Sequence, residues 1–348
     1  MLSELNIANL CNTLGGIVLV SSKDVAKKAG VSQTTVSRVL NAPELVKDKT
    51  RKKVERAMKE LKYIPNANAR LLVQEKTGVI TLLSGPLYNP FFVETTSEIV
   101  NYANSRGYRI NVQFVQDDEV EEAYSSAIQN RIDGIILSCI FLEDSIFEEL
   151  TNLSIPFITF NRKHGKEKFF VEIDNEKAGY LAAEHLIKLG HKKFAWIGGT
   201  LSVSTFYNRY QGFLNACKDY DIQLDNDYII HHKASKNQAQ QVYHYLMSLS
   251  TPPTAICGGS DSIALNLMDV AIQNGKSIPK DISIIGIDNT EKSRHGAIRL
   301  TSVGSISEKN LGLIAIKKLI EMIENKNNTC IQITESVKIF PRSTTARI

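Results

Sequence analysis

Residues 31–41, VSQTTVSRVLN, separate short polar side chains from apolar ones on a predicted helix. Val36, Val39 and Leu40 recur at i, i+3 and i+4, a spacing that buries one helix face. The side chains that can form hydrogen bonds gather at the start of the helix: Ser32, Gln33, Thr34, Thr35, Ser37 and Arg38. The open face of this helix therefore needs a polar partner.

A first helix precedes this segment. Ser21 and Asp24 have the spacing of a capping box at its start. Val25 and Ala29 lie on its apolar face and are predicted to be buried. Gly30 suits the left-handed conformation that commonly ends a helix, so only a short turn separates the two helices.

A third helix is predicted over about 49–62, before Pro65. Its apolar residues share one face: Val54, Ala57, Met58 and Leu61. Three small helices joined by a short turn indicate a helix-turn-helix unit, whose second helix enters the major groove of DNA. The polar face of residues 31–41 is thus predicted to contact DNA.

The distribution of charge agrees with this interpretation. Residues 21–76 contain 14 of the 41 Lys and Arg and 6 of the 37 Asp and Glu, a net charge of +8 that leaves −4 for the remainder. A basic segment suits a polyanionic partner. The alternative is a solvated charged helix over 50–62, TRKKVERAMKELK.

Composition excludes several classes of protein. A chain of 348 residues with 43% hydrophobic content can form two or three domains. The apolar patch GGIVLV at 15–20 has no basic residue before it, and no run reaches the ~18 apolar residues of a membrane span, so we expect a cytoplasmic protein. Five well-separated cysteines without a CxxC motif favour neither disulfides nor a zinc site, and we expect no cofactor.

From Thr77 onward, apolar runs alternate with amphipathic helices. The predicted strands are 78–84, 108–114, 133–138, 155–160, 193–198, 254–259 and 282–287. The predicted helices lie near 91–106, 119–131, 175–189, 206–220, 236–249, 262–274 and 306–325, and the segment IQITESVKIF (331–340) follows. Fully apolar strands separated by helices indicate parallel sheets covered on both faces, with ligands bound at the carboxyl ends of the strands. We expect an α/β fold with two subdomains, one over about 77–174 and 304–328 and the other over about 175–303 and 329–348.

Several motifs closely resemble the LacI/GalR family of bacterial transcription regulators. They are KDVAKKAGVSQTTVSRVLN (23–41), TRKKVERAMKELKYIPNANAR (50–70), NPFF (89–92), IDGIIL (132–137), RYQGF (209–213), GSDSIAL (259–265) and DISIIGIDN (281–289). The resemblance implies a helix-turn-helix domain over 21–65, a hinge over 66–76, and a periplasmic-binding-protein-like core of two doubly wound parallel-sheet subdomains. It also implies a repressor that binds a pseudo-palindromic operator as a homodimer, with a tetramer as the open alternative, and a small-molecule effector, often a sugar.

The resemblance assigns roles to residues of the recognition helix. Gln33 and Thr34 are expected to read bases, and Arg38 to reach a guanine edge. The remaining residues of the set would fix the backbone or phosphate register: Ser32, Thr35, Ser37 and Asn41. A guanidinium can pair bidentately with guanine O6 and N7, whereas hydroxyls suit phosphates. For Thr35 and Ser37 the alternative is helix capping or solvent exposure.

Residues 65–73, PNANARLLV, resemble the hinge helix of the family. The expected contacts with the minor groove come from Asn66, Ala69 and Leu72, with Leu72 as the apolar wedge. Leu71 stands where the family usually has a polar residue, so which leucine enters the groove is open. Residues 1–20 match nothing in the family, and we expect an extension that is disordered or not translated.

The resemblance also nominates an effector pocket. Phe91 and Phe92 would form a stacking wall, and Arg209 and Asp288 a pair that binds hydroxyls or an anion. Their expected neighbours are Asn161, Arg162, Thr205 and Ser260. Polar groups beside aromatic faces suit a sugar ring. The alternatives are core packing for the two phenylalanines and a salt bridge that closes the cleft for Arg209.

Two other classes of protein remain as alternatives. An enzyme is disfavoured because the sequence contains no GxGxxG, P-loop, GxSxG or HExxH motif. A periplasmic-type sugar-binding protein would leave the basic segment 21–76 unexplained. The sequence therefore favours a non-enzymatic regulator.

Overall fold

The computed structural model describes residues 20–63, 76–116, 119–129, 131–152, 155–231, 236–325 and 330–348. The chain divides into two compact units, residues 1–77 and 78–348. Residues 1–19 of the predicted extension, and all of the predicted hinge except Lys76, lie outside the described residues. Val20, the last residue of that extension, is half-buried and packs against the apolar core of the first unit. No helix in the described ranges is long and apolar enough to cross a membrane.

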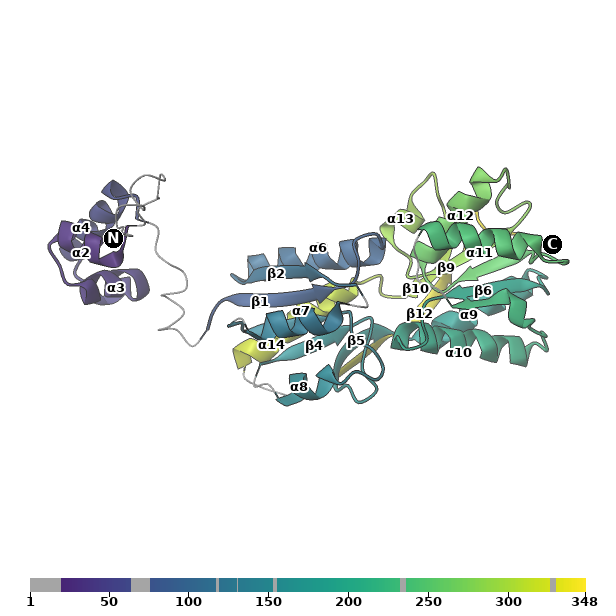
Figure 1. The fold of residues 1–348 in the computed structure, drawn as a ribbon, viewed down its shortest axis with the longest axis horizontal. Coiled ribbons are helices and arrows are strands. Elements are labelled where there is room, and N and C mark those ends of the chain that lie inside the picture. The colour runs from purple at the N-terminus through teal and green to yellow at the C-terminus, as the bar shows by residue number, and fades with distance from the viewer. Residues whose placement is uncertain are drawn as a thin grey trace, which may run out of the picture. The chain divides into compact units, whose positions relative to one another are not determined.

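The described residues of the first unit form three short α-helices (Figure 1). They are α2 (Ser22–Ala29), α3 (Gln33–Asn41) and α4 (Asp48–Glu60), with the 3-10 helix η1 (Pro43–Leu45) between the last two. The capping box forms, because the backbone N–H of Asp24 donates to Ser21 Oγ and that of Ser21 donates to the Asp24 carboxylate. Gly30 ends α2 with φ of 65°.

A small apolar core holds these helices together: Val25, Ala26, Val36, Val39, Val54 and Ala57. The prediction that Ala29 is buried is wrong, because this residue lies in the last turn of α2 and is only half-buried at the edge of the core. Ala26, one turn earlier, takes the interior position instead. One face of each helix is therefore used for packing, and the opposite faces meet solvent.

The second unit contains two six-stranded sheets among its described residues. The first has the strand order β11-β5-β4-β3-β1-β2, formed by β1 (Val79–Ser84), β2 (Arg109–Phe114), β3 (Gly134–Leu137), β4 (Phe157–Phe160), β5 (Phe169–Ile173) and β11 (Ile331–Glu335). The second has the order β12-β10-β9-β8-β6-β7, formed by β6 (Phe194–Gly198), β7 (Ile229–His231), β8 (Ala255–Gly258), β9 (Ser283–Ile287), β10 (Thr301–Ser305) and β12 (Val337–Phe340). All paired strands are parallel except β10 and β12.

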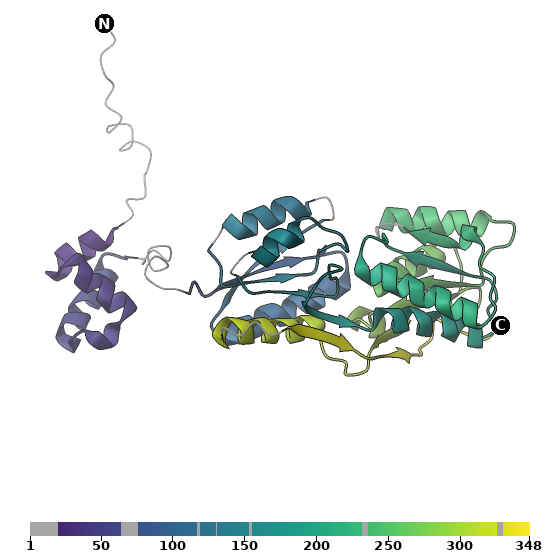
Figure 2. The same ribbon diagram turned by 90° about the horizontal axis from the view of Figure 1, so that it is seen from below.

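Both sheets are doubly wound, with the direction of winding reversing between β1 and β3 in the first and between β6 and β8 in the second. Helices cover both faces of each sheet (Figure 2). On the first sheet, α6 (Pro90–Ser105) and α14 (Leu311–Asn325) lie on one face and α7 (Val120–Gln129) and α8 (Ile146–Asn152) on the other. On the second, α9 (Asn175–Lys188) and α10 (Ser204–Asp219) lie opposite α11 (Lys236–Ser248) and α12 (Asp261–Gln273). The predicted α/β architecture is confirmed.

The chain crosses between the sheets after β5, after β10 and between β11 and β12. The predicted boundary that gave residues 329–348 to the second subdomain is wrong for β11. This strand pairs in parallel with β5, Ile331 lying opposite Phe169, so it completes the first sheet. Ile331 and Ile333 alternate with exposed polar residues, a pattern that suits an edge strand. Of the two strands within residues 329–348, only β12 therefore belongs to the second sheet.

Two glycines bring the backbones of α9 and α10 into contact. A Cβ atom on Gly179 would lie 1.8 Å from the carbonyl oxygen of Arg209, and one on Gly212 would lie 1.8 Å from that of Glu176. Only a residue without a side chain allows this approach. The contact therefore fixes the position of Arg209 relative to the start of α9.

We expect Gly179→Ala to reduce the free energy of unfolding by about 1–3 kcal/mol, because the added methyl group overlaps the backbone of α10 and forces the helices apart. Gly296→Ala is the matched control, since a Cβ there meets no atom within 4 Å. Thermal and urea unfolding of both variants measures the difference. Equal stabilities would show that α9 and α10 can separate without cost.

Candidate DNA interface and ligand cleft

The outer face of α3 presents the residues predicted to contact DNA. Most of them are exposed: Ser32, Gln33, Thr34, Ser37 and Arg38. Thr35 is half-buried. The side chain of Asn41, and the whole of Asn66, Ala69 and Leu72, lie outside the described residues. The polar face expected from the sequence is thus directed to solvent where the structure describes it.

Hydrogen bonds hold the beginning of α3. Ser32 Oγ accepts the Thr35 N–H at 3.1 Å and lies 2.9 Å from Thr35 Oγ1. Ser32 is therefore the N-cap of α3, and the hydroxyl of Thr35 contacts this capping residue. Gln33 Nε2 donates to Ser22 Oγ at 2.9 Å, which ties the start of α3 to the start of α2. The first turn of α3 is consequently held in a defined geometry.

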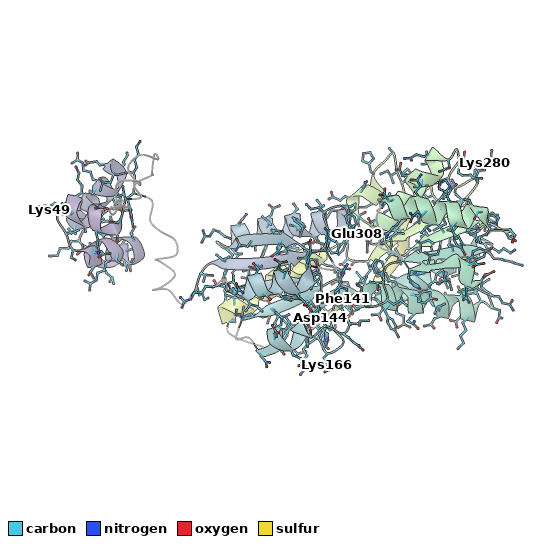
Figure 3. All side chains as sticks on the ribbon, in the orientation of Figure 1. Lys49, Phe141, Asp144, Lys166, Lys280 and Glu308 are labelled. Atoms are coloured by element: carbon cyan, nitrogen blue, oxygen red, sulfur yellow. The ribbon has the colours of Figure 1, made fainter. Side chains whose placement is uncertain are left out.

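The basic side chains of α4 are partly paired along their own helix. Arg51 lies 2.9 Å from Asp48, and Arg56 lies 3.5 Å from Glu60. Such solvent-facing pairs contribute little to stability, and each leaves the guanidinium open to a stronger anion. Lys49 projects outward from α4 (Figure 3). The positive charge of this unit is accessible from solvent.

A cavity of about 440 Å³ lies between the carboxyl edges of the two sheets. Four of the eight predicted pocket residues line it: Phe91, Asn161, Arg209 and Asp288. The rest of its lining was not predicted: Glu94, Thr95, Ser97, Glu98, Ile173, Asn289, Thr290, Glu291, Arg294, Ser305, Glu308, Lys309, Asn310, Leu311 and Leu313. Glu308 is labelled at this junction in Figure 3. Both halves of the second unit therefore contribute to the cavity wall.

Arg209 is the most constrained charged group of the cavity, with 1% of its surface exposed. Its Nη2 donates to Asp288 Oδ1 at 2.7 Å, and its Nη1 donates to the carbonyl oxygen of Gly259 at 2.7 Å. Its Nε donates to Asn175 Oδ1 at 2.9 Å. The ion pair joins α10 to the end of β9, so it lies within the second half and does not bridge the cleft.

The backbone at the cavity edge adopts positive φ at four residues other than glycine: Asn161 (64°), Asp288 (128°), Asn289 (54°) and Glu308 (53°). Such conformations are costly and concentrate at functional sites. Burial raises the pKa of Asp288 to about 6, although the nearby Arg209 acts in the opposite direction, and the carboxylate of Asp261 raises it further. Asp288 is thus held as an anion chiefly by its guanidinium partner.

Phe92 and Arg162 lie behind the cavity wall and do not line it. Phe92 is 3% exposed and contacts Phe91 edge to face, with the ring centroids 5.3 Å apart. The guanidinium of Arg162 lies 6.0 Å from the centroid of Phe92. Core packing therefore describes Phe92, whereas Phe91 is half-buried and faces the cavity.

Thr205 and Ser260 are buried and use their hydroxyls locally. Thr205 Oγ1 donates to the carbonyl oxygen of Asn161 at 2.5 Å, across the two halves. Ser260 Oγ accepts the Ile263 N–H at 3.3 Å and caps α12. Both residues were predicted to contact the ligand, but the hydroxyl of Thr205 links the two halves and that of Ser260 caps a helix.

Further hydrogen bonds connect the halves beside Thr205. The Lys163 N–H donates to Ser204 Oγ at 2.9 Å, and the Leu142 N–H donates to the carbonyl oxygen of Ser202 at 2.8 Å. All three contacts bring loops of the first half to the start of α10. In this structure the two halves of the second unit are therefore closed against each other at the start of α10.

Glu94 forms a separate link between the halves. Its Oε1 accepts the N–H of Glu291 at 2.9 Å, at the start of the short helix α13 (Glu291–Arg294), and its backbone carbonyl accepts from Asn310 Nδ2 at 3.3 Å. Burial raises the pKa of Glu94 to about 7. The carboxylate of Glu291 raises it further, and Arg294 together with the Glu291 and Lys292 N–H groups act in the opposite direction.

Comparison with known families agrees with both units. Residues 22–66 match the model of bacterial regulatory proteins of the lacI family, and residues 183–345 match that of a periplasmic binding protein-like domain. The chain is 32% identical to the HTH-type transcriptional repressor PurR of Serratia proteamaculans over 333 residues. These residues make up 94% of this chain and 97% of that protein. The PurR of Erwinia tasmaniensis is 31% identical over 328 residues, covering 93% and 95%.

Solved structures give the same result. The Lac repressor dimer bound to operator and the anti-inducer ONPF matches with a TM-score of 0.78 and 27% identity, over 94% of this chain and 99% of that one. A putative LacI regulator from Bacillus cereus subsp. cytotoxis matches with a TM-score of 0.70 and 31% identity, over 78% and 99%. The expectation of a regulator and not an enzyme is confirmed by these relatives. The chain belongs to the LacI family of DNA-binding transcriptional repressors.

Proposed function

We propose that the chain binds a pseudo-palindromic operator as a homodimer and that a neutral carbohydrate in the cleft controls this binding. The observation that carries the proposal is the cavity itself, which is lined both by Phe91 and by the buried pair of Arg209 and Asp288. A sugar needs hydrogen-bond partners for its hydroxyls and an apolar platform for its C–H face. The cavity provides hydrogen-bond partners and an apolar platform, and it lies between two halves whose separation can change.

The charges of the cavity favour a neutral ligand over a phosphorylated one. Arg209 is already paired with Asp288, and Arg294 lies 3.8 Å from Glu308. Among the other charged lining residues carboxylates outnumber cations: Glu94, Glu98 and Glu291 against Lys309. A phosphate group would meet more repulsion than attraction here.

The operator proposal rests on the exposed polar face of α3. In a two-fold dimer, two such helices would enter major grooves about one helical turn of DNA apart. A palindromic operator mirrors that symmetry. Arg38 is the residue of α3 best suited to a bidentate contact with guanine.

The ligand proposal is tested by thermal-shift and calorimetric titration with neutral mono- and disaccharides, sugar phosphates and free nucleobases. We expect neutral sugars alone to raise the melting temperature. Binding restricted to nucleobases, which could also stack on Phe91, or to sugar phosphates would show that the carbohydrate assignment is wrong.

We expect Phe91→Ala to weaken binding of the best sugar in that panel by at least about tenfold, because it removes the apolar platform. Val93→Ala on the same helix is the control, since Val93 is 45% exposed and does not line the cavity. Isothermal titration measures both affinities. An unchanged affinity in Phe91→Ala would place the sugar elsewhere.

We expect Arg38→Ala to lose about 1–3 kcal/mol of binding to the cognate operator and much less on random DNA, because a base contact carries sequence information. Arg56→Ala on α4 is the control and should weaken both complexes slightly and equally. Fluorescence anisotropy at two salt concentrations distinguishes the cases. Equal losses in Arg38→Ala would mean that Arg38 contacts only phosphate.

We expect closure of the cleft to increase as pH falls from about 8 to about 6. Glu94 has its pKa raised to about 7 in the closed arrangement, whereas an opened cleft would return it toward the ordinary 4.5. The closed form thus binds the proton more tightly, and its advantage is lost as pH rises through 7. Distances between spin labels in the two halves report closure. Glu94→Gln should abolish the pH dependence and Glu98→Gln should retain it; the reverse pattern would contradict the assignment.

A further inference from the structure

The hydrogen bond from Gln33 to Ser22 restricts how the recognition helix presents an amide to DNA. Gln33 is the first residue of α3 and is exposed, and Ser22 is the first residue of α2. Gly30, in the left-handed conformation, turns the chain between them. The 2.9 Å contact from Gln33 Nε2 to Ser22 Oγ therefore anchors one end of an otherwise flexible side chain.

The hydroxyl of Ser22 is not needed to start its own helix. Ser21 is the N-cap of α2 and forms the complete capping box with Asp24. Ser22 is half-buried beside α3, where its oxygen accepts from the glutamine. The role of Ser22 can thus be tested apart from the stability of the helix.

When Ser22 accepts one N–H of the Gln33 amide, the second N–H and the oxygen Oε1 remain as one donor and one acceptor in a fixed orientation. The two N–H groups of Nε2 point in different directions, so one can reach Ser22 while the other lies beside Oε1. One donor next to one acceptor is complementary to N7 and N6 of adenine in the major groove. Guanine presents two acceptors, N7 and O6, and would face the oxygen of the amide.

We propose that Ser22 positions the amide of Gln33 so that the chain prefers adenine over guanine at the base pair that Gln33 contacts. This inference rests on the proposed function, because it takes α3 as the helix that enters the major groove. It adds a positioning residue on α2 and the identity of one base. Gln33 would read the base, and Ser22 would act only through Gln33.

The test is selection of binding sites from a randomised duplex library by the full-length chain, with sequencing of the bound DNA. We expect one symmetrical pair of positions to show adenine, and Gln33→Ala to abolish the preference at those positions alone. Ser22→Ala should reduce the adenine-to-guanine ratio there by about fivefold, the low end of what a bidentate base contact provides. Ser22→Thr, which keeps a hydroxyl, should restore it.

Ser21→Ala is the control for a merely structural role. It removes the N-cap and should lower the melting temperature of the first unit, yet leave the adenine preference unchanged. A full adenine preference in Ser22→Ala, or guanine at the position that depends on Gln33, would overturn the inference alone. If the wild-type chain enriches no sequence at all, the operator proposal is wrong and the assignment of Gln33 falls with it.

Discussion

The burial of Arg209 is the constraint on which the cleft depends. A guanidinium that is 1% exposed must find acceptors inside the protein, because an unpaired buried charge is very costly. Its acceptors come from the start of α9, the loop after β8 and the end of β9. Three segments far apart in the sequence are therefore held around one side chain. The close contact of α9 and α10 at their glycines brings Arg209 near enough to the start of α9 for its hydrogen bond to Asn175.

The same group links the site to the first crossing between the sheets. Asn175, which accepts from Arg209, also donates to Glu172 at the end of β5, and Glu172 pairs with Lys163 of the first half. Asn175 begins α9 directly after the chain leaves the first sheet. A ligand that displaces Arg209 thus also affects the hydrogen-bonded side chains of Asn175 and Glu172, which lie at this crossing.

The fold was predictable wherever burial alone decides the structure. Continuous apolar runs indicated seven strands. The prediction missed β10, which reads TSVGS and has no apolar run, and β5, in which the buried Glu172 interrupts the apolar residues of FFVEI. The site was less predictable, because tertiary contacts decide which hydroxyls remain available. Ser260 is used as a helix cap and Thr205 as a contact between the halves. Glu94 was missed although it lies three residues after Phe91 on one predicted helix face, the signal that could have identified it.

The hydrogen bonds that close the cleft also limit what a ligand can do. A ligand shifts the equilibrium between open and closed forms only by its difference in affinity for the two. One that fits within about 440 Å³ can add contacts to Phe91 and Asp288 while the links from Thr205 and Glu94 persist, so it favours closure. One too large for that volume must break those links before it binds, so it favours opening. The size of the ligand relative to the closed cavity therefore sets the sign of the response, and the links themselves set its magnitude.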